Sequence, residues 1–318
     1  SYTAFELPDR DGSDPERQAA VAPVVLPETD RSIFAFPKGA GAGILIHSIF
    51  EMLDFASAID DTSESVIAQA AGNSSASDKT AGNSSASDKT AASSSASDNA
   101  AQKALDRYGF DRQWQPCLKE MVQQVLRTPL SSPEGSFTLG GLRQGSWSTE
   151  LEFFFPLRRI TSSRLSELLM QHGVIPNNTD TAAALQALDF APVKGMLMGF
   201  MDMVFEAKGR YYLLDWKSNH LGNAVEAYHR DHLGKAMQDN LYRLQYLLYT
   251  VALDRFLSLR VPGYCYETHF GGAIYVFLRG VSAERGEEYG FFRDLPSEAL
   301  IRELQELLIE TETGESEA

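Results

Sequence analysis

The middle of the sequence holds two apolar runs separated by a very short gap, and this spacing restricts the fold more than any other feature. The first run covers 196–205 and the second covers 210–216. Both are rich in aromatic and aliphatic residues, and Lys208-Gly209 lies between them. Two such runs joined by a loop that contains Gly are typical of a β-hairpin with a tight turn. The sequence therefore predicts a hairpin in the protein core.

Three charged residues lie in this core-like hairpin. With a two-residue loop, counting outward places Asp202 directly opposite Asp215, and side-chain alternation places Lys217 on the same face as Asp215. Opposed carboxylates destabilise a strand pair. Three interpretations remain: a solvated surface hairpin, an ion pair of Lys217 with one aspartate, and a divalent cation held by both carboxylates. The apolar surroundings and the Asp-x-Lys spacing favour the cation, because Mg²⁺ prefers a few carboxylates with water and phosphate oxygens.

Composition limits the class of protein. The chain has 318 residues, of which 43% are hydrophobic, and this is enough for one large core. We expect no membrane span, because no apolar run approaches about 18 residues. Cys117 and Cys265 have neither a metal-binding nor a disulfide-framework spacing, which favours reduced thiols in a cytosolic protein. The sequence contains no G-x-x-x-x-G-K-[ST] motif, so we expect no P-loop motor in it.

Negative charge is concentrated at the two ends of the sequence. The formal net charge is −15, which argues against nonspecific binding of nucleic acid by the free chain. Residues 151–280 nevertheless carry 13 Lys and Arg against 12 Asp and Glu, whereas the flanking segments are strongly acidic. The segment that holds the hairpin therefore permits a phosphate-bearing ligand, and we expect a partner to bring DNA to it.

Four segments are expected along the chain. Residues 1–33 are polar and rich in Pro, which predicts an N-terminal arm, and 34–310 form the main domain. Inside that domain, 71–100 contain "AGNSSASDKT" twice and then "AASSSASDNA", a low-complexity pattern that predicts a disordered insertion. Residues 311–318 form an acidic tail.

The apolar periodicity predicts an α/β fold in which helices flank a mixed central sheet. A largely buried helix is expected at about 43–55, helical segments at 102–127, and a strand at 148–157 before the hairpin. After the hairpin we expect one or two helices within 223–257, a buried strand within 271–280 and a final helix within 297–310.

Four further residues are candidates for a site around the hairpin. Glu150 lies on the strand before it, Gln245 and Tyr249 are one helical turn apart after it, and His47 lies on the first buried helix. Each also has an ordinary structural explanation: a solvated acid for Glu150, a satisfied core histidine for His47 and plain packing for Tyr249.

Taken together, these residues resemble a known family. Glu150, "GFMD" ending at Asp202, "DWK" at 215–217 and "QYLLY" at 245–249 are similar in order and spacing to the RecB-family nucleases of the PD-(D/E)xK superfamily. The segments "FPKGAGAGILIHSIFEMLDF" and "HFGGAIYVFLRG" resemble the C-terminal nuclease domains of that family. The resemblance runs from about 34 to 310 without 71–100, and it implies a restriction-endonuclease-like core.

The resemblance also implies a metal site. In that family the side chains at the positions of His47, Asp202 and Asp215 bind a divalent ion, and the main-chain carbonyl at the position of Trp216 contributes. The expected ion is Mg²⁺, in one or two copies, and Mn²⁺ or Ca²⁺ is able to occupy the same site.

The remaining site residues receive roles from the same resemblance. Lys217 matches the catalytic lysine, and Glu150 completes the acidic cluster. Gln245 and Tyr249 match a pair that supports the site or contacts DNA.

The implied function is a metal-dependent deoxyribonuclease, exonucleolytic or endonucleolytic, in a RecBCD-type helicase–nuclease of double-strand-break repair and recombination. Implied partners are single- and double-stranded DNA, RecC-like and RecD-like subunits, a helicase motor and a RecA-type recombinase. The implied location is the bacterial cytoplasm, at the nucleoid. The alternative is an inactive nuclease fold that serves as a docking surface for such partners.

Overall fold

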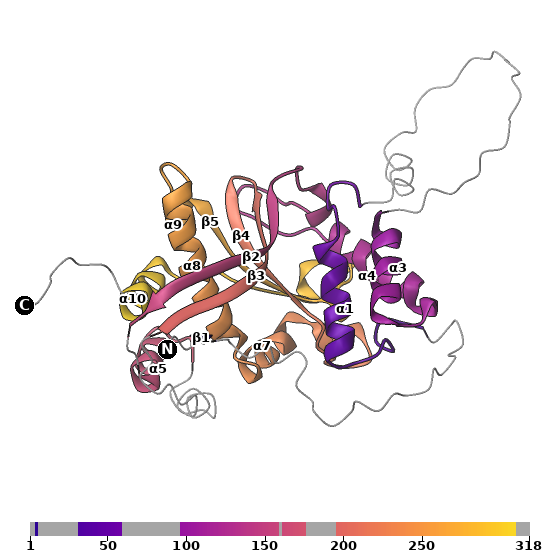
Figure 1. Ribbon diagram of the computed structural model, residues 1–318, viewed down its shortest axis with the longest axis horizontal. Coiled ribbons are helices and arrows are strands. Elements are labelled where there is room, and N and C mark those ends of the chain that lie inside the picture. The colour runs from indigo at the N-terminus through magenta and orange to yellow at the C-terminus, as the bar shows by residue number, and fades with distance from the viewer. Residues whose placement is uncertain (1–3, 6–30, 59–95, 159–160, 176–194, 310–318) are drawn as a thin grey trace, which may run out of the picture.

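The computed structural model describes residues 4–5, 31–58, 96–158, 161–175 and 195–309 (Figure 1). Its α-helices are α1 Ala40–Glu51, α3 Ala96–Tyr108, α4 Gln115–Arg127, α5 Ser162–Gln171, α7 Arg230–Asp239, α8 Tyr242–Arg260, α9 Tyr266–His269 and α10 Glu298–Leu308. Its strands are β1 Ala4–Phe5, β2 Trp147–Leu157, β3 Gly195–Ala207, β4 Arg210–Lys217, β5 Phe270–Phe277 and β6 Phe291–Asp294. The α/β class predicted from the sequence is confirmed.

The predicted hairpin is formed by β3 and β4. Backbone pairing runs from Ala207–Arg210 outward to Met203–Leu214, which confirms a loop of two residues. Lys208 and Gly209 both have a positive φ, 54° and 78°, as the favoured two-residue turn requires. Glycine adopts this conformation without steric cost, whereas lysine does not.

The described strands form one mixed sheet. Along it the strands follow the order β2, β3, β4, β5 and β6, and the two-residue β1 pairs in parallel with β3. Strands β4 and β5 are parallel, and α7, α8 and α9 connect them. Strand β6, which the sequence analysis did not predict, pairs antiparallel with β5. This mixed sheet between helices is consistent with a PD-(D/E)xK-like core.

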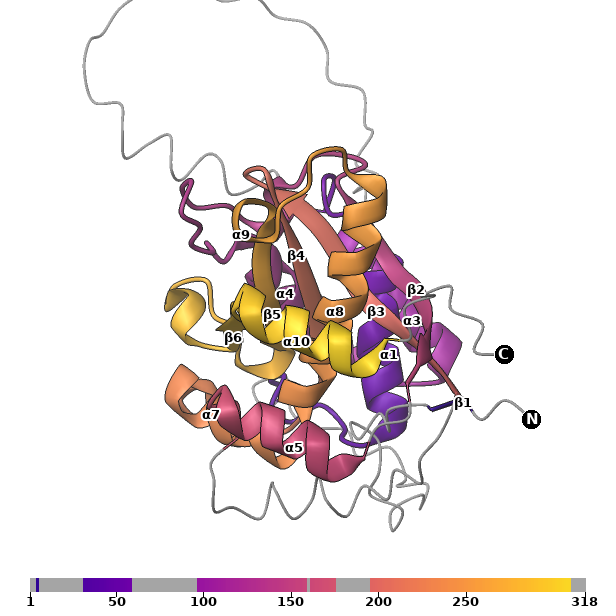
Figure 2. The same ribbon diagram turned by 90° about the vertical axis from the view of Figure 1, so that its left-hand side faces the viewer.

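Helices cover both faces of the sheet. Figure 2 shows α8 and α10 in front of the strands, with α1, α3 and α4 behind them. Two buried hydrophobic clusters correspond to these layers, one with α5, α7, α8 and α10 and the other with α1, α3 and α4. Successive residues of β4 alternate between them: Leu213 packs in the α8-side cluster, and Leu214 and Trp216 pack in the α1-side cluster. The central hairpin is therefore buried on both sides.

Helix α1 packs tightly on the end of β4. The ring of Phe50 stacks on Trp216 with centroids 4.1 Å apart and an interplanar angle of 19°. One turn before His47, Gly43 lies so close to β4 that an added Cβ would stand 3.0 Å from Oγ of Ser218. The absence of a side chain at Gly43 therefore allows the close approach of helix and strand.

The structure corrects one sequence-based boundary. Residues 96–100 are the first turn of α3, so the prediction that the low-complexity insertion extends to residue 100 is wrong at that end. Ser97 is buried there and accepts a hydrogen bond of 2.7 Å from Nε2 of Gln123. Small residues form this helix because it packs between α1 and α4. Residues 71–95, most of the predicted arm and residues 311–318 lie outside the described residues.

Helix α1 begins three residues and ends four residues earlier than the 43–55 expected from the sequence, whereas β2 matches the predicted strand within one residue. Among the described helices, none is both long and apolar enough to cross a membrane.

The turn provides a test of stability. Asn tolerates the left-handed conformation better than Lys, so we expect Lys208→Asn to raise the free energy of unfolding by about 0.5 kcal/mol. Urea denaturation measures this change. Lys208→Ala is the control, because Ala has the same conflict with a positive φ; an equal gain in both variants would contradict the explanation.

Candidate active site

Three carboxylates occupy one level of three neighbouring strands. In the register of β2 with β3, Glu150 faces Asp202, between the pairs Thr149–Met203 and Leu151–Met201. The pairing of β3 with β4 ends at Met203–Leu214, and Asp202 and Asp215 are the next residues of the two strands beyond that pair. The hairpin therefore brings Glu150, Asp202 and Asp215 to one level of the sheet.

The backbone is irregular at this level. Glu150 has a φ of 49°, which is unusual for a residue other than Gly. Leu197 and Met201 of β3 pack in the α8-side core, whereas Met203 packs in the α1-side core. The side-chain alternation of β3 is therefore interrupted at Asp202, where the buried face of the strand changes.

Asp215 and Lys217 form a buried ion pair. Oδ2 of Asp215 lies 2.8 Å from Nζ of Lys217, and the side chains are 3% and 2% exposed. The ammonium also lies 4.1 Å from the ring centroid of Tyr242 and 5.4 Å from that of Tyr275. These ring faces attract a cation, and the attraction strengthens where water is excluded. The ion pair interpretation of Lys217 is thus confirmed for one aspartate.

The pKa of Asp215 is raised to about 7, and burial is the largest cause. This net value includes the charge of Lys217, which lowers the pKa, that of Asp202, which raises it, and that of His47, which lowers it. The positive charge of Lys217 therefore offsets only part of the free-energy cost of burying the ionised carboxylate of Asp215. A further cation next to Asp215 and Asp202 would stabilise their ionised forms.

Asp202 contacts both β4 and α1. Its Oδ2 accepts a hydrogen bond of 2.8 Å from the backbone N–H of Trp216 and lies 3.6 Å from Nδ1 of His47. Asp202 and His47 are partly exposed, at 25% and 19%. The two residues therefore line the open side of the site, while Asp215 and Lys217 form its buried side.

Helix α8 supports the buried side through a chain of hydrogen bonds. The hydroxyl of Tyr275 donates to Oε1 of Gln245 at 3.0 Å, and Nε2 of Gln245 donates to the hydroxyl of Tyr249 at 3.1 Å. Tyr275 is the β5 partner of Asp215 in the sheet. Burial, and after it the charge of Asp215, raises the pKa of Tyr249 and of Tyr275. Both phenols therefore remain neutral, and the geometry favours site support over DNA contact for Gln245 and Tyr249.

The sequence analysis did not identify Glu51, Tyr242 and Tyr275 as site residues. Glu51 lies one helical turn after His47, and its pKa is raised by burial and then by the charge of Glu150, while His47 lowers it. The spacing His47-x-x-x-Glu51 was visible in the sequence. Tyr242 and Tyr275 contact the ammonium of Lys217 only through tertiary packing, so no local sequence pattern indicated that they belong to the site.

The donors expected for a metal are close together but do not surround a common point. In the part of the chain that the structure describes, no group of three or more His, Cys, Asp and Glu side chains is arranged to hold a metal ion. Asp215 is directed at Lys217, and Asp202 at the N–H of Trp216. The two carboxylates nevertheless suit Mg²⁺ or Mn²⁺, and the imidazole adds a nitrogen donor of the kind that first-row transition metals accept. The residue types therefore fit a divalent ion.

Comparison with curated proteins gives the family. The chain is 36% identical over 290 residues to the RecBCD enzyme subunit RecB of Escherichia coli (strain K12), a match that covers 91% of this chain and 21% of that protein. The chain belongs to the RecB family. The corresponding proteins of Buchnera aphidicola subsp. Acyrthosiphon pisum and Haemophilus influenzae are 34% and 36% identical over 204 and 195 residues.

These matches cover only part of the relatives. The Buchnera and Haemophilus matches include 64% and 61% of this chain. The chain spans between 15% and 21% of the length of these three relatives. No protein-family model matches the chain.

The buried ion pair gives a prediction that is independent of activity. Asp215→Ala leaves the ammonium of Lys217 buried without its carboxylate, so we expect a loss of about 3–5 kcal/mol in the free energy of unfolding. Adding Lys217→Met removes the unpaired buried ammonium and places a thioether sulfur against the ring of Tyr242. We expect the double variant to recover most of the loss in urea denaturation. A double variant less stable than Asp215→Ala would contradict this description of the pair.

Proposed function

We propose that this chain is a Mg²⁺-dependent deoxyribonuclease domain that hydrolyses DNA phosphodiester bonds in a RecBCD-type helicase–nuclease. The observation that carries the proposal is the buried Asp215–Lys217 pair beside Asp202 on the neighbouring strand. A docking surface requires no such arrangement, because a buried ion pair adds little net stability. Membership of the RecB family supports the same function.

The residues divide into an ion-binding side and a charge-stabilising side. Asp202, Asp215, the imidazole of His47 and the main-chain carbonyl of Trp216 would hold the ion. When bound, Mg²⁺ supplies neutralisation of phosphate charge and a water molecule of lowered pKa. Asp202 and His47 are partly exposed, so the ion would be reached from their side of the site.

Lys217 and Glu150 would act on the phosphate and the water. Oδ2 of Asp215 lies 2.8 Å from Nζ of Lys217 and holds the ammonium in place, where it is able to stabilise negative charge that develops on the phosphate. The rings of Tyr242 and Tyr275 exclude water from this ammonium. Glu150, at the same sheet level as Asp202, adds a carboxylate that is able to orient the attacking water.

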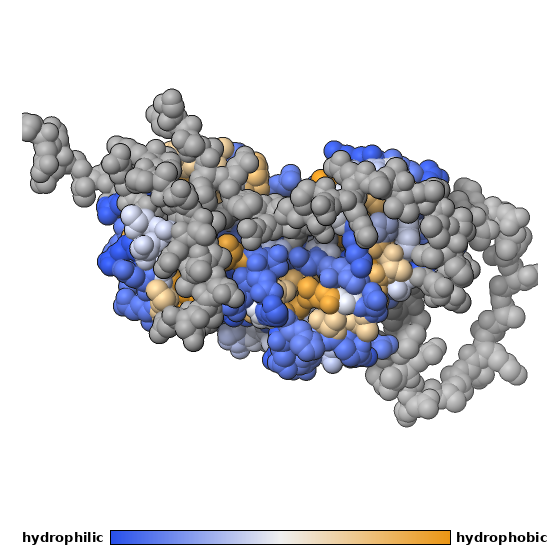
Figure 3. Space-filling model, turned by 90° about the horizontal axis from the view of Figure 1, so that it is seen from below, coloured by the Kyte–Doolittle hydropathy of each residue, from blue (hydrophilic) through white to orange (hydrophobic). Residues whose placement is uncertain are grey.

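Exposed apolar side chains on β2 and β3 provide a contact surface for DNA bases. Phe154 pairs with Met198 in the sheet, and Phe200 lies two residues before Asp202. These side chains are 68%, 42% and 55% exposed, on the face opposite the α8-side core. Hydrophobic residues reach the surface as separate patches among hydrophilic ones (Figure 3). Bases of single-stranded DNA stack on exposed aromatic rings, and such stacking is tolerant of sequence.

The larger assembly is part of the proposal. The relatives are named as subunits of the RecBCD enzyme and are several times longer than this chain. We propose that RecC-like and RecD-like subunits and a helicase motor deliver DNA to this domain. Such delivery would compensate for the net charge of −15, which opposes capture of free DNA.

The direct test is cleavage of linear single-stranded DNA with and without Mg²⁺. We expect cleavage that EDTA abolishes, and a loss of at least about 100-fold in Asp202→Asn, because this change removes a charged donor from the ion. Asp202 is the better position to change, because substitution of Asp215 also leaves the buried ammonium of Lys217 without its carboxylate partner. Activity is measured by the release of acid-soluble nucleotides.

The matched control is Glu306→Gln, which changes an exposed acid on α10, outside the strands that carry the site and the proposed base-contact surface. We expect its cleavage rate to remain within about twofold of the unmutated rate. A purified, folded chain without metal-dependent cleavage, or full activity in Asp202→Asn, would contradict the proposed function and favour the inactive docking module.

The base-contact surface gives a second test. We expect Phe154→Ala and Phe200→Ala each to weaken binding of a labelled oligothymidine by about 1–3 kcal/mol, measured by fluorescence anisotropy without cleavage. Phe256→Ala is the control, since Phe256 is 42% exposed near the end of α8, about four turns from Tyr242. Equal weakening in all three variants would show that the aromatic contacts are nonspecific.

A further inference from the structure

Arg279 is a large buried side chain that the proposed chemistry does not use. It follows β5 in the short segment Leu278–Gly280 and is 2% exposed. Its partners in the described part of the chain are main-chain oxygens and not a carboxylate. Nε donates to Ser218 at 3.0 Å, Nη1 to Ile33 and Phe36 at 2.7 and 2.9 Å, and Nη2 to Pro37 at 2.6 Å.

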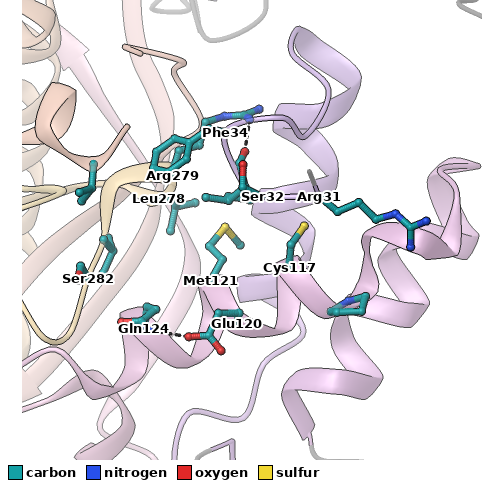
Figure 4. A pocket seen from close by; sticks show the side chains of 14 residues that line it. Arg31, Ser32, Phe34, Cys117, Glu120, Met121, Gln124, Leu278, Arg279 and Ser282 are labelled. Carbon is teal, nitrogen blue, oxygen red and sulfur yellow. Dashed lines mark hydrogen bonds between the residues drawn. The ribbon is translucent and has the colours of Figure 1, made fainter. Parts of the chain in front are cut away.

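These hydrogen bonds join two segments that are far apart in the sequence. Ser218 directly follows Lys217 at the end of β4, and Ile33, Phe36 and Pro37 precede α1. Figure 4 shows Arg279 reaching from the end of β5 to the strip of chain that contains Ser32 and Phe34. The planar guanidinium has five N–H donors in a fixed arrangement, so it holds several acceptors at set directions in a way that a lysine ammonium does not.

The position of α1 is fixed at the same place by a second contact. Gly43 approaches Ser218 so closely that an added Cβ would stand 3.0 Å from its Oγ. His47 lies one turn farther along α1, with Nδ1 3.6 Å from Asp202. The spacing between α1 and the end of β4 therefore sets the distance between the imidazole and the carboxylates.

We propose that Arg279 is a positioning residue that fixes α1 against the end of β4 and so holds His47 at the ion-binding carboxylates. The expected effect of Arg279 on metal binding and DNA cleavage rests on the proposed function. Its expected effect on the position of α1 does not. A contact that only stabilised the fold would lower the stability without changing either the ion affinity or the placement of the helix.

A matched control exists at the opposite end of β4. Arg210, the first residue of that strand, also donates to two main-chain oxygens, those of Glu267 and Phe270, at 3.0 and 3.1 Å. It pairs in addition with Glu134 at 2.8 Å. Arg210 thus connects the sheet to neighbouring segments as Arg279 does, but far from His47.

The first experiment compares Arg279→Lys with Arg210→Lys in the full chain. We expect both to unfold at lower urea concentration. Only Arg279→Lys is expected to weaken Mn²⁺ binding, by about tenfold or more, and to lower kcat for single-stranded DNA without raising KM. Mn²⁺ binding is measured by titration calorimetry. Unchanged Mn²⁺ affinity and kcat in Arg279→Lys, with reduced stability, would overturn the proposal.

The second experiment measures the position of α1 without any activity. Spin labels at the exposed positions Ala40 and Lys208, in a chain with Cys117 and Cys265 replaced by Ala, report the distance from α1 to the hairpin turn. We expect a broader or shifted distance distribution in Arg279→Lys and an unchanged one in Arg210→Lys. An unchanged distribution in both overturns the proposal, even if the chain is an active nuclease.

The same spin labels distinguish failure of the positioning role of Arg279 from failure of the proposed nuclease function. A shifted helix in a chain that neither binds Mn²⁺ nor cleaves DNA supports the positioning role and contradicts the proposed function. If Arg279→Lys does not fold, Gly43→Ala tests the same spacing, because its methyl group presses on Ser218 while alanine favours the helix. A displaced α1 with weaker Mn²⁺ binding supports the proposal, and an unchanged distance and affinity overturn it.

Discussion

The buried ion pair of Asp215 and Lys217 is the interaction on which the rest of the site depends. Two charges removed from water are costly unless their surroundings compensate. Here the rings of Tyr242 and Tyr275 face the ammonium, and the hydrogen bonds of Gln245 hold Tyr275 and Tyr249 in place. The ion pair therefore depends on side chains of α8 and β5. This dependence explains why Tyr249 and Tyr275 lie in the interior of the protein.

The neighbouring residue, Trp216, connects this pair to the other half of the molecule. Its ring stacks on Phe50 of α1, while its N–H binds the carboxylate of Asp202. Because alternate residues of a strand point to opposite faces, three consecutive residues of β4 reach the helix layers on both sides. The site therefore lies where the two cores meet, and movement of α1 against β4 changes its geometry directly.

Much of this arrangement was predictable from local patterns. The two-residue loop fixed the register of the hairpin, and alternation placed Asp215 and Lys217 on one face. The left-handed backbone of Glu150 was not predictable, because Glu has no preference for that conformation. The contacts of Arg279 were also hidden, since they join residues more than 240 positions apart through main-chain oxygens. The start of α3 was missed because its small residues resemble the preceding repeat.

We propose that Asp202 and Asp215 share a divalent ion beside Lys217. Diffraction from crystals grown with Mn²⁺ tests it most directly, since the anomalous signal locates the metal without reference to activity. We expect a peak within about 2.5 Å of oxygens of both carboxylates and close to the imidazole of His47. A peak elsewhere, or Asp215 still paired with Lys217 and no metal at saturating Mn²⁺, would contradict it.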